Sequence, residues 1–106
     1  MKNAVPVPLT APIEPRPVVQ AIARKMEIKL RANDHKSYQG TPAIVLFRKL
    51  MEEVAELYEA ILWKSPEAIA EEAADVNNVA TMIADVVGGL QYEAEEGAVV
   101  RETGRA

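Results

Sequence analysis

Four acidic residues recur at a spacing that could hold a metal ion. Glu53 and Glu56 are three residues apart, and so are Glu72 and Asp75. Residues three apart lie on adjacent turns of one helix face, so two antiparallel helices could aim these carboxylates at a single point. Hard cations such as Mg²⁺ prefer oxygen ligands of this kind. Since the chain has no cysteine and its single histidine lies far from both pairs, the pattern predicts a Mg²⁺ site, with Mn²⁺ as the alternative ion.

The second acidic pair is also notable because it interrupts an apolar helix face. At about 100° per residue, the segment 66–87 places its aliphatic side chains on one stripe, and Glu72 and Asp75 project from within it. An unpaired carboxylate in such a stripe is costly or shifts its pKa. This face therefore requires a cation. The competing explanation is a salt bridge to Arg48 or Lys49.

Length and composition limit the class of protein. The chain has 106 residues, 49% of them hydrophobic and 26% charged, as in an ordinary single globular domain. A net charge of −4 argues against a general nucleic-acid binder. No apolar run approaches the roughly 18 residues that a membrane-spanning helix needs, and the first residues lack the apolar core of a signal peptide. We expect a soluble, cytoplasmic protein without nucleic-acid or membrane partners.

The charges are unevenly distributed along the chain. Bases dominate residues 16–36 and acids dominate residues 52–75. A basic segment beside a metal-holding acidic one is a plausible polyphosphate site, because the metal bridges carboxylate to phosphate while the bases neutralise the remaining charge. The alternative is that the two segments attract each other or face water.

Local signals predict an all-α fold. Prolines dominate an extended arm over residues 1–16, a helical domain spans 17–90, and a charged tail covers 91–106. Thr41-Pro42 and Ser65-Pro66 are typical helix starts, with a capping hydroxyl before a proline at the first helical position.

These starts, together with Gly88-Gly89 as a stop signal, predict helices over 17–32, 42–63 and 66–87. Because only two or three residues join the last two, these should form an antiparallel hairpin.

The helix faces suggest self-association. On the second helix Glu53 borders a wide apolar arc, whereas Glu56 lies opposite the centre of that arc. Either the carboxylates line an open cleft or a second subunit packs against them. A homo-oligomer that completes a four-helix-type bundle is the more economical interpretation. On the third helix, Glu67, Glu71 and Asp85 are expected on the opposite, solvated side.

The two acidic motifs resemble those of a known family. Glu52-Glu53-Val54-Ala55-Glu56, followed by Glu72-Ala73-Ala74-Asp75, is similar to the Glu-Glu-x-x-Glu and Glu-x-x-Asp pair of MazG-like all-α nucleoside triphosphate pyrophosphatases. The resemblance covers about residues 17–90. It implies Mg²⁺-dependent hydrolysis of nucleoside triphosphates to monophosphate and pyrophosphate, a homodimer or homotetramer of helical subunits, and metal ligation by Glu53, Glu56, Glu72 and Asp75.

The chemistry of this cleavage suggests further roles. In-line attack of water on the α phosphorus needs a proton acceptor, for which Glu53 is the first candidate and Glu52 the second. Candidates for substrate binding are Lys29, His35 and Lys36 for the β and γ phosphates, Asn78 for a base or sugar, and Trp63 for stacking on a base. Each has a plainer competitor: His35 and Lys36 as ordinary loop residues, Asn78 as a polar flank, and Trp63 as a packing residue.

Other functions remain open. Phosphoribosyl-ATP pyrophosphohydrolysis is a sibling reaction, but relatives with that activity usually carry a histidine shortly after the aspartate, and residues 76–80 contain none. A non-catalytic helical oligomerisation or regulatory module is a second alternative, and the presence of all four carboxylates argues against it. A di-iron carboxylate bundle is weaker still, because neither acidic pair has the Glu-x-x-His form.

Overall fold

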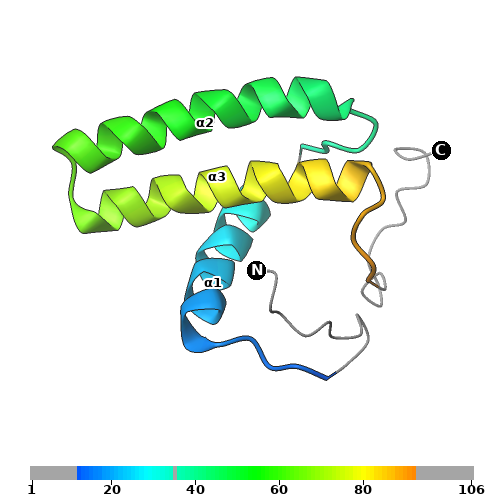
Figure 1. The fold of residues 1–106 in the computed structure, drawn as a ribbon, viewed down its shortest axis with the longest axis horizontal. Coiled ribbons are helices and arrows are strands. Elements are labelled where there is room, and N and C mark those ends of the chain that lie inside the picture. Colours follow the sequence, from blue (N-terminus) through cyan, green and yellow to red (C-terminus); the bar gives the residue numbers. More distant parts are fainter. Residues whose placement is uncertain (1–11, 35, 93–106) are drawn as a thin grey trace, which may run out of the picture.

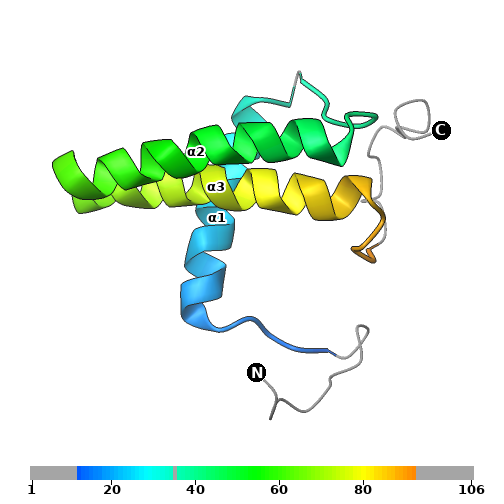
Figure 2. The same ribbon diagram turned by 45° about the horizontal axis from the view of Figure 1, so that its top comes forward.

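The computed structural model describes residues 12–34 and 36–92. All regular secondary structure in these residues is helical: α1 (Pro17–Ala32), α2 (Ala43–Trp63) and α3 (Pro66–Val86). In Figure 1, α2 and α3 lie side by side and antiparallel, and α1 crosses α3 steeply. The turned view in Figure 2 shows the same arrangement. The predicted all-α fold, a helical hairpin plus an N-terminal helix, is confirmed. Assembly into a larger bundle remains a prediction.

The start of α3 follows the predicted capping chemistry. Ser65 is the N-cap, and its hydroxyl oxygen accepts a hydrogen bond from the Ala68 amide at 3.2 Å. Pro66 follows at the first helical position, where it lacks only an amide that would have no intrahelical partner. The connection from α2 is therefore only Lys64-Ser65, which forces the two helices into an antiparallel hairpin.

The end of α3 uses glycine as expected. Gly88 has a φ of 79°, a left-handed conformation that glycine adopts without a side-chain clash. Its amide donates to the Asp85 carbonyl, and the Gly89 amide donates to the Ala84 carbonyl, both at 2.9 Å. These bonds satisfy carbonyls that the helix end would otherwise leave open.

The predicted cap of α2 is wrong. Pro42, and not Thr41, is the N-cap residue, and no side chain caps this helix end. The Pro42 carbonyl accepts hydrogen bonds from the amides of Val45 and Leu46 at 3.0 and 3.2 Å. Because the helix begins one residue later than the Thr-Pro pattern suggests, the Thr41 hydroxyl lies outside the capping position.

A narrow strip of α2 packs against α3. Its members alternate in spacings of four and three residues, as in a helical seam: Leu46, Leu50, Glu53, Leu57 and Ala60. Ala60, and Ala74 on α3, are fully buried. Glu53 occupies the middle of this seam and is only 7% exposed. One predicted metal ligand is thus held by the packing of the hairpin itself.

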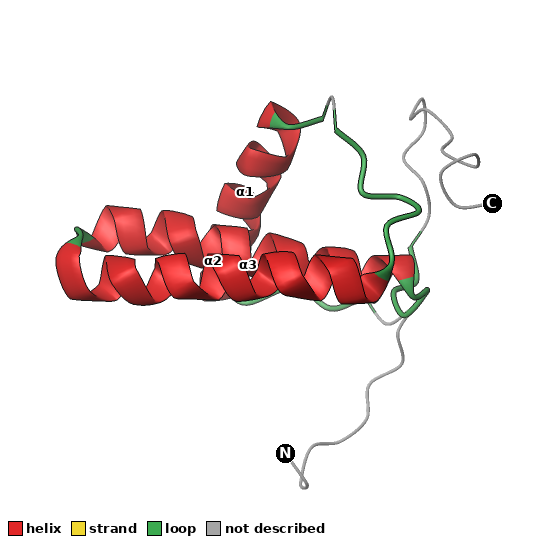
Figure 3. Cartoon of the chain, turned by 90° about the horizontal axis from the view of Figure 1, so that it is seen from above, coloured by secondary structure: helices red, strands yellow, loops and turns green. Residues whose placement is uncertain are grey.

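The first helix docks by polar contacts. None of its residues is buried, and Ile22, Met26 and Leu30 are only half-buried. The Asn78 side-chain amide on α3 donates to the Met26 carbonyl at 3.2 Å. Viewed from above in Figure 3, α1 projects away from the hairpin. Its placement therefore depends on bonds near its crossing point with α3.

The expectation of a solvated side is wrong for Asp85, whereas Glu67 is exposed and the Glu71 side chain is 47% exposed. Asp85 is only 8% exposed. Its carboxylate accepts hydrogen bonds from the hydroxyls of Tyr38 and Tyr92, the latter at 2.8 Å, and from the side-chain amide of Gln39 at 3.5 Å. Glu71 is half-buried and pairs with lysines of α1. Periodicity within one helix cannot reveal the segments that fold over its far side.

Asp85 should therefore stabilise the fold. We expect Asp85→Ala to lower the free energy of unfolding by about 2 to 4 kcal/mol, because the tyrosine hydroxyls lose their hydrogen-bond acceptor. Urea denaturation followed by far-ultraviolet circular dichroism measures this loss. Asp34→Ala is the matched control, since Asp34 is exposed, and its unfolding energy should change by less than about 0.5 kcal/mol. Equal losses in both variants would contradict the assignment.

The outer face of α2 is apolar and exposed. We use this name for the helix surface that α3 leaves uncovered, whose large hydrophobic side chains are between 45% and 78% exposed: Ile44, Val45, Phe47, Met51, Val54, Tyr58, Ile61, Leu62 and Trp63. So many exposed large hydrophobic side chains on one helix are unusual for a soluble monomer. No described helix is long and apolar enough to cross a membrane.

Candidate metal centre

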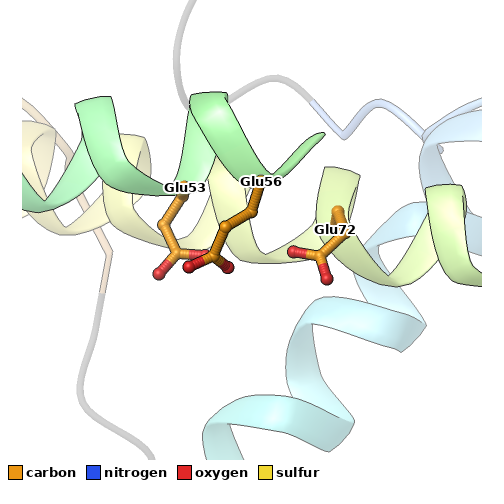
Figure 4. Close-up of side chains that lie close together, drawn as sticks. All are labelled: Glu53, Glu56 and Glu72. Carbon is orange, nitrogen blue, oxygen red and sulfur yellow. The ribbon is translucent and has the colours of Figure 1, made fainter. Parts of the chain in front are cut away.

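Three carboxylates converge beside the hairpin. Glu53 and Glu56 come from α2 and Glu72 comes from α3, and each offers an oxygen within 4.8 Å of the other two. Figure 4 shows the three side chains pointing to the same side of the hairpin. The spacing of three residues on α2 and the antiparallel packing of α3 together produce this arrangement. The structure thus brings together three of the four predicted metal ligands.

The charges of this cluster are only partly balanced. One Glu53 oxygen lies 3.1 Å from the Lys49 ammonium. The Glu72 Oε1 atom is buried and has no hydrogen-bond partner among the described residues. Repulsion from Glu53, with smaller contributions from burial and from Glu72, raises the pKa of Glu56. Crowded carboxylates with an orphaned buried oxygen fit a divalent cation, whose hard charge prefers such oxygen ligands.

The fourth predicted ligand has a different partner. Asp75 lies one turn after Glu72 but is not part of the group whose oxygens lie within 4.8 Å of one another. Its Oδ1 is 3.3 Å from the Lys29 ammonium, which also lies 3.2 Å from Glu71 Oε1. The sequence suggests Arg48 or Lys49 as the salt-bridge partner of this acid. The bridge comes instead from α1, whose crossing position cannot be inferred from the sequence of α3.

Two lysines beside the acids have raised pKa values. Burial acts to lower the pKa of Lys29, but its bonds to Glu71 and Asp75 outweigh burial and raise it. The hydrogen bond to Glu53 raises the pKa of Lys49. The hydrogen bond from Lys25, at 2.9 Å, is the main cause of the lowered pKa of Glu71. The cluster is thus flanked by lysines from both α1 and α2.

The remaining candidate residues are more dispersed. Glu52 is exposed, lies outside the convergent group, and is 3.9 Å from Lys49. Lys36 is exposed in the connection between α1 and α2. His35 lies outside the described residues.

Two candidates for contacts with the nucleoside differ sharply in exposure. Asn78 is buried, and its Oδ1 has no hydrogen-bond partner within the described part of the chain. Its amide nitrogen is already engaged by the backbone of α1. Trp63, at 78% exposed, is no core residue. It lines a shallow groove on α2 together with Glu56, Tyr58 and Leu62.

Sequence reasoning missed two lysine contacts of the site. Lys49 stands four residues before Glu53, a spacing that favours pairing on one helix, and its ammonium contacts Glu53 and not the acids on α3 for which it was a candidate partner. Lys25 bonds Glu71 across the α1–α3 crossing. No sequence signal identifies that second contact, because it depends on how two helices cross.

Comparison with known proteins identifies one family. A sequence model described as phosphoribosyl-ATP pyrophosphohydrolase matches residues 19–96. The matched range covers α2 and α3 completely and α1 from its third residue. No curated protein and no solved structure matches the chain significantly.

Proposed function

The chain belongs to the phosphoribosyl-ATP pyrophosphohydrolase family, which is part of the MazG-like all-α nucleoside triphosphate pyrophosphatase superfamily, and from this we propose a Mg²⁺-dependent reaction. The enzyme hydrolyses the bond between the α and β phosphates of a nucleoside triphosphate, and releases the monophosphate and pyrophosphate. The convergence of Glu53, Glu56 and Glu72 within 4.8 Å is the observation that supports this proposal most strongly.

The acidic cluster is the proposed cation site. Glu53, Glu56 and Glu72 hold the ion, and the buried Glu72 oxygen receives the partner that it otherwise lacks among the described residues. When bound, a divalent cation neutralises the charge that develops on the departing pyrophosphate. Mg²⁺ is the expected ion and Mn²⁺ the alternative, because every donor is a carboxylate oxygen.

The chain's own groups supply the proton transfer and the phosphate contacts. Water attacks the α phosphorus, the bond from that phosphorus to the bridging oxygen breaks, and Glu53 accepts the proton of the water. Burial of Glu53 in the helix seam fixes its orientation, whereas the exposed Glu52 is the weaker candidate. Lys29, His35 and Lys36 are proposed to bind the β and γ phosphates.

A second candidate substrate is phosphoribosyl-ATP, and the description of the matching family favours it. Both substrates contain the same phosphoanhydride, so the catalytic groups would be shared. Because residues 76–80 contain no histidine, the simple nucleoside triphosphates remain the preferred candidate substrates. Asn78 and Trp63 are the proposed contacts to the base or sugar.

A pyrophosphate-release assay tests the function. Purified protein with Mg²⁺ is offered each ribo- and deoxyribonucleoside triphosphate and phosphoribosyl-ATP. We expect equal amounts of monophosphate and pyrophosphate from at least one substrate, loss of turnover with EDTA, and recovery when Mg²⁺ is restored. Release of orthophosphate instead, or no turnover of any compound, would refute the proposal.

We also propose that the enzyme is a homodimer or homotetramer that associates through the outer face of α2. That face is too apolar to remain in water without cost. Three residues of that face, Tyr58, Leu62 and Trp63, line the same groove as Glu56, so a second subunit that covers the groove would border Glu56. This arrangement would enclose a site that a single subunit leaves open.

A further inference from the structure

Lys29 lies between two acids at the edge of the candidate metal centre. Its ammonium is 3.3 Å from Asp75 Oδ1, 3.5 Å from Asp75 Oδ2 and 3.2 Å from Glu71 Oε1. The Lys29 side chain is 28% exposed and that of Asp75 32%. Ion pairs that are this far withdrawn from water are screened less than surface pairs.

The crossing of α1 over α3 holds this ion pair in register. Asn78, three residues after Asp75, donates to the carbonyl of Met26, three residues before Lys29. On the other side, Lys25 bonds Glu71 at 2.9 Å. Contacts on both sides therefore restrict the Lys29 side chain to the vicinity of Asp75.

Asp75 and Glu72 are one helical turn apart, but only Glu72 joins the oxygens that converge within 4.8 Å. Glu72 Oε1 has no hydrogen-bond partner among the described residues, whereas Asp75 is already paired with a lysine. Both acids belong to the same Glu-x-x-Asp motif. The structure thus divides the motif into one carboxylate that is available to a metal and one that a lysine occupies.

We propose that Lys29 competes with a divalent cation for Asp75. The cation binds Glu53, Glu56 and Glu72. Asp75 becomes a further ligand of the same cation only when Lys29 leaves it. This inference rests on the proposed function, because it assumes that the acidic cluster binds a metal. Lys29 thereby sets the affinity of the site.

Binding of Mn²⁺, followed by electron paramagnetic resonance of the free ion, tests the competition without any activity measurement. We expect Lys29→Met to tighten Mn²⁺ binding about 10-fold or more, since it both removes a positive charge and frees a ligand. Lys25→Met is the matched control: it removes the same charge one turn away, and within the described residues the Lys25 ammonium pairs with Glu71 and not with Asp75. It should tighten binding by less than about 3-fold.

A double-mutant cycle separates two contributions to the gain in Mn²⁺ affinity: the release of Asp75 as a ligand and the loss of the lysine charge. Asp75→Asn should change Mn²⁺ affinity little in the wild-type background and cancel most of the gain in the Lys29→Met background. Lys29→Arg should retain wild-type affinity. Lys29→Gln serves in place of Lys29→Met if circular dichroism shows that the methionine variant is unfolded.

The outcomes distinguish this inference from the proposed function. If the wild-type protein binds Mn²⁺ and the Lys29 and Lys25 variants gain equal affinity for Mn²⁺, the proposed competition is wrong and the metal site is supported. The competition would also be overturned, and the metal site retained, if Asp75→Asn weakened Mn²⁺ binding equally in both backgrounds. Failure of both wild type and Lys29→Met to bind Mn²⁺ would overturn the metal site and the competition together.

Discussion

Replacing Glu72 by glutamine is expected to lower the rate of pyrophosphate release by about 10² to 10³-fold, the usual effect of removing one preorganised electrostatic group from an active site. The substitution keeps the shape of the side chain and removes its negative charge. The buried Glu72 Oε1 has no hydrogen-bond partner within the described residues, so no described side chain competes with a metal ion for this oxygen. Steady-state assays under saturating Mg²⁺ measure the loss.

Stability separates this catalytic role from a structural one. Because Glu72 crowds Glu53 and Glu56, loss of its charge relieves repulsion, and Glu72→Gln should unfold no earlier than wild type. Glu67→Gln is the matched control: Glu67 is on the same helix but exposed in its first turn, and its activity should be unchanged. An active Glu72→Gln variant, or one that loses activity only by unfolding, would contradict the proposed metal site.

Introducing charged side chains on the outer face of α2 is expected to dissociate the protein into monomers. Met51 and Ile61 are each 58% exposed on that face. A buried glutamate at either position would lack a partner in the proposed interface. We expect Met51→Glu combined with Ile61→Glu to weaken self-association at least about 100-fold, as for the loss of central interface residues. Sedimentation velocity over a range of protein concentrations measures the change.

Ile28→Glu controls for the general effect of adding charge to an exposed apolar site. Ile28 is 61% exposed but lies on α1, away from the proposed interface. Its association should match that of wild type. A wild-type protein that sediments as a monomer at every concentration would refute association through this face.

The helix boundaries could be predicted because their signals are local. Ser65, Pro66 and Gly88 act on the backbone within one turn of themselves, and the predicted bounds of α1 agree with the structure. Thr41 shows the limit of such reasoning. Whether it or Pro42 caps α2 depends on where the first carbonyl accepts a bond, which a residue pattern specifies only to within one position.

The candidate site was partly predictable for a similar reason. A spacing of three residues places Glu53 and Glu56 on one face of α2, and the short connection brings α3 alongside. The partner of Asp75 was not predictable, because Lys29 reaches it from a helix that crosses at a steep angle. The burial of Asp85 under Tyr38 and Tyr92 likewise depends on segments outside its own helix.

The weak burial of α1 determines which part of the molecule should unfold locally first. No side chain of this helix is buried, whereas the hairpin contains the described core. Regions with few buried apolar contacts separate at a lower free energy than the rest of a domain. We therefore expect the helix carrying Lys29 and Lys25 to detach first, while α2 and α3 stay folded and the carboxylates of the hairpin keep their mutual arrangement.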